Sequence, residues 1–207
     1  MKRLFLLAAA LMSFSSITAQ QTETKGLKMV SKPMTDDPDL NNFLSFEGLD
    51  YYTIAFHDEK LKNKNYHITV KELWNGKVTS ESTVFNSAEI GIEQFEKVND
   101  TILKFKVLSK HTHDQKLKLS FMFDKFVVTK EYDAIDSDMY SLRNVVDERN
   151  LNLNYNEKFY LLAYILPHVR EDGSSSWCEV GTSGDDVENW GKKFDIEHYL
   201  VFEMLFE

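Results

Sequence analysis

The stretch YHITVKELWNGKVTSESTVF, residues 66–85, decides the fold of this 207-residue chain. From Tyr66 to Val70 apolar and polar side chains alternate, which is typical of a β-strand with one buried face. Asn75 and Gly76 separate this run from a second one that is rich in valine and threonine. An Asn-Gly pair favours a type I′ turn because both central residues of that turn adopt positive φ angles. The stretch therefore predicts a β-hairpin.

The same period-two pattern recurs on both sides of the hairpin. Further strands are expected at residues 50–57, 101–109, 116–123 and 126–132. Segments 159–166 and 199–206 are apolar on both faces, which predicts central or covered strands. The second of these should be paired on both sides, because a long apolar edge strand invites aggregation. The sequence thus predicts a mainly β fold, an antiparallel β-sandwich-like single domain, with a small barrel as the alternative.

One or two short helices are expected between the strands. Ser137 or Asp138 can cap a helix that runs to about Arg149, since apolar residues recur there every three or four positions. Segment 87–99 fits neither the helical nor the strand period well, and Gly91 weakens a helix. The conformation of this second segment is left open.

Residues 1–19 are typical of a secretory signal peptide. Lys2 and Arg3 precede the apolar run LFLLAAALM, and small and polar residues follow up to Ala19, the expected last residue of the leader. The apolar run is too short to cross a hydrocarbon core of about 30 Å as a helix. No cysteine follows Ala19 to carry a lipid. We therefore expect a soluble periplasmic or extracellular protein that is neither a lipoprotein nor stably inserted in a membrane.

After the leader, the sequence divides into two parts. Residues 20–42 are polar, contain Pro33 and Pro38, and are interpreted as a flexible polar lead-in. Residues 43–207 form the expected β-rich domain. The leader ends Thr-Ala-Gln-Gln, which resembles the leaders of exported proteins of the Bacteroidetes. This resemblance implies the type of cell envelope from which the protein is exported, and it implies no activity.

A second resemblance lies further along the chain. Asp100, Thr101 and Ile102 resemble the Asp-Ser/Thr-apolar acceptor of O-glycosylation in exported Bacteroidetes proteins. A three-residue match of this kind is weakly specific, so it adds little to the export prediction.

Charge and cysteine content narrow the possible partners. The chain has a net charge of −9, and removal of Lys2 and Arg3 with the acid-free leader would make it −11. Such a charge argues against nucleic acid or an anionic membrane surface as the partner. Cys178 is the only cysteine, so the chain can form no internal disulfide and its stability must come from the hydrophobic core.

Candidate metal ligands are few. His111 and His113 have the spacing of paired ligands on a strand, but a zinc site needs three or four ligands. No other residues have a matching spacing. The oxygen-bearing residues 185–189 are a weaker candidate for calcium, and that question stays open. We expect no metal and no cofactor.

Candidate catalytic groups do not assemble into a known motif. Cys178 could pair with His168 or His198, but its neighbours match no thiol-protease signature. Nucleophile elbows of the Gly-x-Ser-x-Gly kind and phosphate-binding glycine loops are also absent from the sequence. No catalytic residue is assigned.

The candidate ligand-binding residues are the three tryptophans, Trp74, Trp177 and Trp190. Trp74 lies at the end of the hairpin strand, and the other two lie in a stretch rich in glycine, serine and aspartate. Aromatic rings in loops can stack on a sugar or anchor a protein partner. The alternative interpretation is that each ring closes the end of the core.

The function predicted from these features is that of an exported, non-catalytic binding or envelope-associated protein with a glycan or protein partner. The alternative is a secreted hydrolase of envelope or polysaccharide material, with carboxylates that are scattered in sequence but gathered in space. A small outer-membrane β-barrel is less favoured. The sequence does not indicate the oligomeric state.

Overall fold

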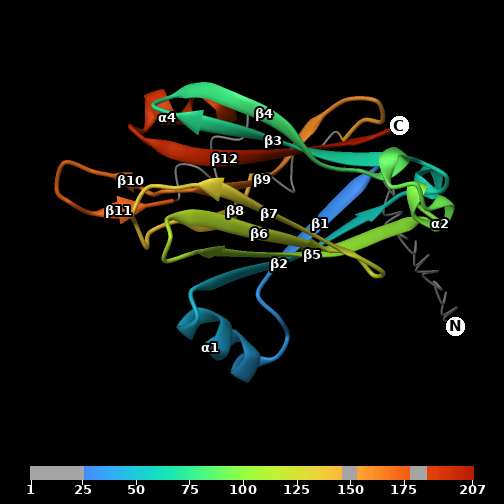
Figure 1. The fold of residues 1–207 in the computed structure, drawn as a ribbon, viewed down its shortest axis with the longest axis horizontal. Helices are drawn as coiled ribbons and strands as arrows, with labels where there is room; N and C mark the ends of the chain where they lie inside the picture. The colour runs from blue at the N-terminus through green and yellow to red at the C-terminus, as the bar shows by residue number, and fades with distance from the viewer. Residues whose placement is uncertain (1–25, 146–152, 178–185) are drawn as a thin grey trace, which may run out of the picture.

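The computed structural model describes residues 26–145, 153–177 and 186–207, which form two five-stranded antiparallel sheets packed face to face (Figure 1). The first sheet has the order β1 (Lys28–Pro33), β2 (Leu49–His57), β5 (Ile102–His111), β6 (Lys116–Met122), β7 (Val127–Asp133). The second has the order β4 (Lys77–Asn86), β3 (Tyr66–Trp74), β12 (His198–Phe206), β9 (Phe159–Ile165), β8 (Ser141–Asn144). Each sheet keeps its own edge strands, so the fold is the predicted sandwich and not a closed barrel.

The predicted hairpin is confirmed as β3 and β4. Asn75 and Gly76 have φ angles of 51° and 69°, as a type I′ turn requires. The turn packs closely against α4 (Trp190–Lys193), where a Cβ atom added to Gly191 would lie 2.6 Å from the Gly76 Cα. Two glycines therefore let the hairpin turn contact that helix backbone to backbone.

The last strand is central and paired on both sides, as predicted. β12 is antiparallel to β3 and to β9. Its even-numbered residues face the first sheet, while Tyr199 on its other face packs against Trp190 of α4. Coverage on both faces explains why this strand is apolar except at His198 and Glu203.

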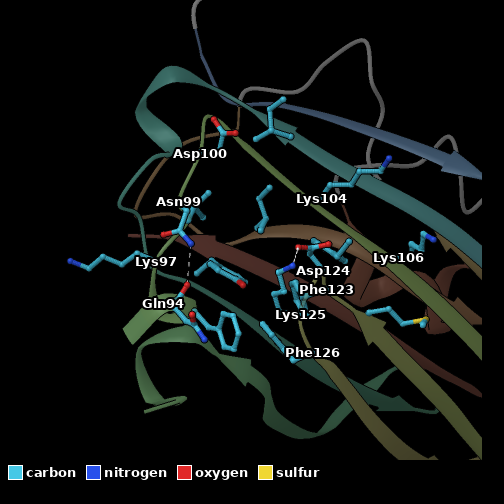
Figure 2. Close-up of a pocket in the computed structure, with 17 residues that line it drawn as sticks. Gln94, Lys97, Asn99, Asp100, Lys104, Lys106, Phe123, Asp124, Lys125 and Phe126 are labelled. Atoms are coloured by element: carbon cyan, nitrogen blue, oxygen red, sulfur yellow. Dashed lines mark hydrogen bonds and ion pairs between the residues drawn. The ribbon is translucent and has the colours of Figure 1, made fainter. Parts of the chain in front are cut away.

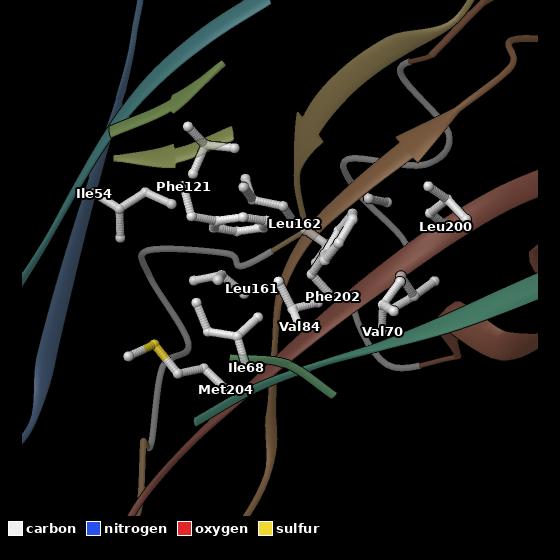
Figure 3. Close-up of a cluster of buried hydrophobic side chains, with 14 of the residues drawn as sticks. Ile54, Ile68, Val70, Val84, Phe121, Leu161, Leu162, Leu200, Phe202 and Met204 are labelled. Atoms are coloured by element: carbon white, nitrogen blue, oxygen red, sulfur yellow. The ribbon is translucent and has the colours of Figure 1, made fainter. Parts of the chain in front are cut away.

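Side chains from both sheets form one continuous core. Ile54 and Phe121 of the first sheet meet Leu162 and Phe202 of the second, and all four are fully buried (Figure 3). The rings of Phe121 and Phe202 have centroids 5.5 Å apart. The core thus joins the two layers through the residues that alternate inward from each strand.

The helix predicted from residue 138 to about 149 is wrong where the structure describes it. Ser141–Asn144 form β8, which pairs with β9, and residues 146–149 lie outside the described ranges. Segment 87–99 holds two short helical turns, η2 (Ser87–Glu89) and α2 (Glu93–Glu96). Other short elements are η1 (Glu59–Leu61), η3 (Val187–Asn189) and the hairpin of β10 (His168–Val169) with β11 (Ser175–Ser176).

The expected flexible lead-in is ordered over much of its length. Residues 28–33 form β1, which extends the first sheet through β2, with Met29 buried in the core. The helix α1 (Pro38–Phe46) follows and projects from this sheet in Figure 1. Asp37 caps α1 by accepting hydrogen bonds from the amides of Asp39 and Leu40. The leader lies in residues 1–25, outside the described residues.

Candidate functional site

The three tryptophans occupy different places in the fold. Trp190 is fully buried against Tyr199, so it belongs to the core. Trp74 is half-buried, donates from Nε1 to Glu72 over 2.7 Å and stacks on His198. Trp177 is half-buried under the guanidinium of Arg143, 4.7 Å from the ring centroid. None of the three lines either of the two cavities that follow.

The surroundings of Trp74 form a closed polar cluster. The Ile135 amide donates to the Tyr140 hydroxyl, which is also hydrogen-bonded to Nδ1 of His198 over 2.6 Å. His198 is fully buried, and this burial lowers its pKa to about 4. The neutral imidazole therefore ties β12 to the chain before β8, and it has no contact with solvent through which a substrate could reach it.

A cavity of about 410 Å³ lies between α1, β2 and β8 and contains Asp50 and Asp138. Burial raises the pKa of Asp50, which is the property expected of a catalytic acid. Its carboxylate, however, accepts hydrogen bonds from the Leu142 amide over 2.8 Å and from the Ser141 hydroxyl over 3.4 Å. Asp50 thus holds β8 beside β2.

The outer face of the second sheet carries a network of ion pairs. The nearly buried carboxylate of Glu203 forms ion pairs with the ammonium groups of Lys71, over 2.9 Å, and Lys158, over 3.5 Å. Lys71 also contacts Glu188 at 2.5 Å, and Lys158 contacts Glu81 at 2.7 Å. Each charge in this network has an opposite partner. The network therefore links β3, β4, β12 and η3 with the residue before β9, and it leaves no free charge for a ligand.

The larger cavity, about 690 Å³, lies at the end of the sandwich near α2 (Figure 2). It opens between β5, the turn that joins β6 to β7, and the segment 94–100. Aromatic rings form its floor. The centroids of Phe123 and Phe126 are 4.6 Å apart, and those of Phe123 and Phe105 are 5.0 Å apart. We call this cavity the aromatic pocket.

The aromatic pocket exists because β5 is longer than β6. β6 pairs with β5 only as far as the Met122–Lys106 pair, after which the chain turns away. The Phe123 amide donates to the Phe126 carbonyl over 2.9 Å and closes that turn. Residues 102–105 of β5 therefore extend past β6, and the turn aromatics lie under this overhang.

Four lysines surround the aromatic pocket: Lys97, Lys104, Lys106 and Lys125. Figure 2 shows Lys104 and Lys106 on the same side and Lys125 beside Asp124. Lys125 is paired with Asp124 at 3.0 Å, but within the described ranges the other three make no ion pair. In a chain with a net charge of −9, three unpaired cations around an aromatic floor mark a local positive site.

Sequence reasoning did not find the aromatic pocket. The strand predicted at 101–109 is present as β5, and its alternation places Lys104 and Lys106 on the exposed face, opposite Phe105. The floor, however, comes from three separate segments, and no local pattern brings them together. The sequence signal was the high content of phenylalanine and lysine in residues 95–126. These residues were interpreted only as parts of strands, and not as the lining of a pocket.

The histidine pair His111 and His113 forms no metal site within the described ranges. His111 ends β5 and stacks near Tyr140, while His113 lies in the exposed turn that follows. In the part of the chain that the structure describes, no three His, Cys, Asp or Glu side chains gather as metal ligands would. Cys178 and Asp185 lie outside that part. No helix within it has the length and apolarity needed to cross a membrane.

Comparison with known proteins adds no functional information. No protein-family model, curated protein or solved structure matches the chain. The aromatic pocket is therefore the feature on which a function can be built.

Proposed function

We propose that this protein is an exported, non-catalytic binding protein whose ligand joins an apolar portion to an anionic group and occupies the aromatic pocket. The observation that carries the proposal is a lysine rim around an aromatic floor in a strongly acidic chain. The export part depends on the signal-peptide character of residues 1–19.

The volume and lining of the aromatic pocket suit a bound ligand. Its volume of about 690 Å³ is within the usual range of ligand sites, about 300–1,000 Å³. Burying an apolar group against Phe126 and Phe95 removes water from both surfaces, which contributes about 25 cal/mol per Å² of apolar surface. The unpaired lysines favour an anion over a cation of the same shape.

The lining residues favour binding over catalysis. The charged groups at the rim are lysines and two aspartates, Asp100 and Asp124, on the exposed loops. Asp124 is paired with Lys125, and Asp100 accepts from the amide and hydroxyl of Thr101. These carboxylates are engaged with their sequence neighbours, so the rim offers charge recognition and no paired acid and base.

Dodecanoate tests the proposal because it combines a carboxylate with an apolar chain. Calorimetric titration should show binding to the wild-type protein. The double variant Lys104→Glu/Lys106→Glu should bind at least tenfold more weakly, because repulsion replaces attraction at the rim.

The matched control is the double variant Lys118→Glu/Lys130→Glu. Lys118 and Lys130 are exposed on β6 and β7 of the same sheet and do not line the aromatic pocket. This control makes the same change in net charge and should keep the wild-type affinity. No binding to the wild type, or equal loss in both double variants, would contradict the proposal.

A further inference from the structure

The overhang of β5 points to the class of ligand. We propose that the aromatic pocket receives an extended acidic segment of a protein partner, which adds to the first sheet as an antiparallel strand beside residues 102–105 of β5. This inference rests on the proposed function, because it assigns the ligand of the same pocket.

The edge of β5 is open on one side only. β5 pairs with β2 from His57 opposite Ile102 to Leu49 opposite Lys110. On its other side it pairs with β6 only from Lys106 onward. Four residues at the start of β5 thus have a sheet neighbour on one side and the aromatic pocket on the other.

The alternation of hydrogen-bonded and non-bonded pairs between β5 and β2 shows which backbone groups of β5 face the pocket. The Asp58 amide donates to the Thr101 carbonyl over 3.0 Å, so this opposed pair is hydrogen-bonded. Bonded and non-bonded pairs alternate along an antiparallel ladder, and therefore Leu103 and Phe105 bond to β2. The amide and carbonyl groups of Ile102 and Lys104 must then point away from β2, toward the pocket.

The hydrogen bonds between β5 and β6 lead to the same assignment of backbone directions. The Thr112 amide donates to the Lys116 carbonyl over 2.9 Å, which continues the ladder with β6. Thr112 and Lys104 are an even number of residues apart, so both direct their backbone groups to the β6 side. In the described ranges, no turn or loop backbone hydrogen-bonds to Ile102 or Lys104. The edge therefore offers two unused amides and two unused carbonyls.

Side-chain alternation defines the sequence that would fit. In an added antiparallel strand, the residue opposite Lys104 points its side chain to the same exposed face as Lys104. Its neighbours point the other way, over the aromatic floor formed by Phe123 and Phe126. Acidic residues that flank one apolar residue match both environments. At about 3.4 Å per residue, the four-residue overhang accommodates three or four residues of the partner.

An antiparallel strand follows from the surrounding sheet. Both neighbours of β5 run antiparallel to it, and the partner segment would lie where β6 stops. Main-chain hydrogen bonds then supply affinity, while the pocket and the lysines supply specificity, as in other cases of strand addition.

Labelled peptides test the inference by fluorescence polarisation on the purified protein. Acetyl-Thr-Glu-Phe-Glu-Thr-amide should bind, and the Thr-Lys-Phe-Lys-Thr peptide should bind at least tenfold more weakly. Methylation of both glutamate amides should also weaken binding at least tenfold, because the residue opposite Lys104 donates its amide to that edge.

Methylation of the phenylalanine amide is the matched control, since that amide points away from β5. It should leave the affinity within about threefold of the parent peptide. Equal affinity of both methylated peptides, or binding of the lysine peptide as tight as that of the glutamate peptide, would overturn strand addition.

The dodecanoate titration separates the two proposals. If dodecanoate binds in a Lys104- and Lys106-dependent manner but the glutamate peptide does not bind, the binding function stands and the peptide inference is wrong. If neither probe binds, both are wrong. If Lys104→Glu/Lys106→Glu aggregates without any change in peptide affinity, the lysines only protect an exposed edge, and the inference is again wrong.

Discussion

At the scale of single residues, His198 shows how burial controls a titratable group. Its Nδ1 is hydrogen-bonded to the Tyr140 hydroxyl and its ring stacks on Trp74, with no exposure to solvent. Burial lowers its pKa to about 4, although the nearby charge of Asp133 acts in the opposite direction. An unfolded histidine has a pKa of about 6.5 and takes up its proton first as the pH falls. The stability linked to His198 is therefore complete above pH ~6.5 and is lost between pH ~6.5 and ~4.

Urea unfolding of the wild type and of His198→Gln at pH 7.5 and pH 4.5 measures this effect. The wild type should lose about 2–3 kcal/mol more of its free energy of unfolding on acidification than the variant. A glutamine amide can still hydrogen-bond to the Tyr140 hydroxyl but cannot titrate, so the comparison isolates the imidazole. An identical loss in both proteins would show that His198 takes up its proton equally in the folded and unfolded states.

Gly191 is a second position where one atom matters. An added Cβ would lie 2.6 Å from the Gly76 Cα and 3.1 Å from the Ile196 carbonyl oxygen, and these backbone atoms cannot rotate away. Gly191→Ala should therefore lower the free energy of unfolding by about 1–3 kcal/mol, measured by chemical denaturation. Gly91→Ala is the comparison, because Gly91 has open space around it and only a positive φ of 69°. An effect at Gly191 smaller than that at Gly91 would contradict the close contact of turn and helix.

At the scale of elements, β1 tests whether the polar lead-in belongs to the fold. Met29 is buried and lies opposite Phe56 of β2, while its neighbour Val30 is about half-exposed. Met29→Ala should cost about 2–4 kcal/mol of stability, since it leaves a cavity in the core. Val30→Ala should change stability by at most about 0.5 kcal/mol. Equal and small effects in urea unfolding would mean that β1 contributes little to the sandwich.

The elements that sequence reasoning predicted correctly are those with local causes. The hairpin follows from Asn75 and Gly76, whose chemistry selects the turn, and the exposed lysines follow from alternation along β5. The helix predicted after Ser137 is wrong. The apolar residues of this segment fit the helical period as well as the strand period, so their spacing alone could not decide between a helix and a strand. The segment becomes β8 through contacts with distant residues, including the hydrogen bond from the Leu142 amide to Asp50.

The aromatic pocket could not be predicted for a related reason. It depends on the register between β5 and β6, which leaves residues 102–105 without a neighbour. No residue pattern states where one strand ends relative to the next. The tryptophans, in contrast, were candidate ligand-binding residues because of their residue type alone, and Trp190 proves to be a core residue. Composition identified candidate residues, while the inter-strand register created the pocket.

At the scale of the whole molecule, the two ends of the sandwich differ in character. One end contains Trp74, which donates to Glu72, and the hydrogen-bonded pair of Tyr140 and His198. The opposite end, near α2, contains the aromatic pocket with its unpaired lysines. A ligand should therefore engage the second end and leave the first unchanged.

An NMR titration of the ¹⁵N-labelled protein with dodecanoate tests this claim most directly. Backbone amide signals of residues 102–106 and 123–126 should shift with saturation, while the indole N–H signals of Trp74 and Trp177 should stay in place. Shifts centred on the two indoles, with the amides of 102–106 unmoved, would contradict the assignment of the aromatic pocket as the binding site.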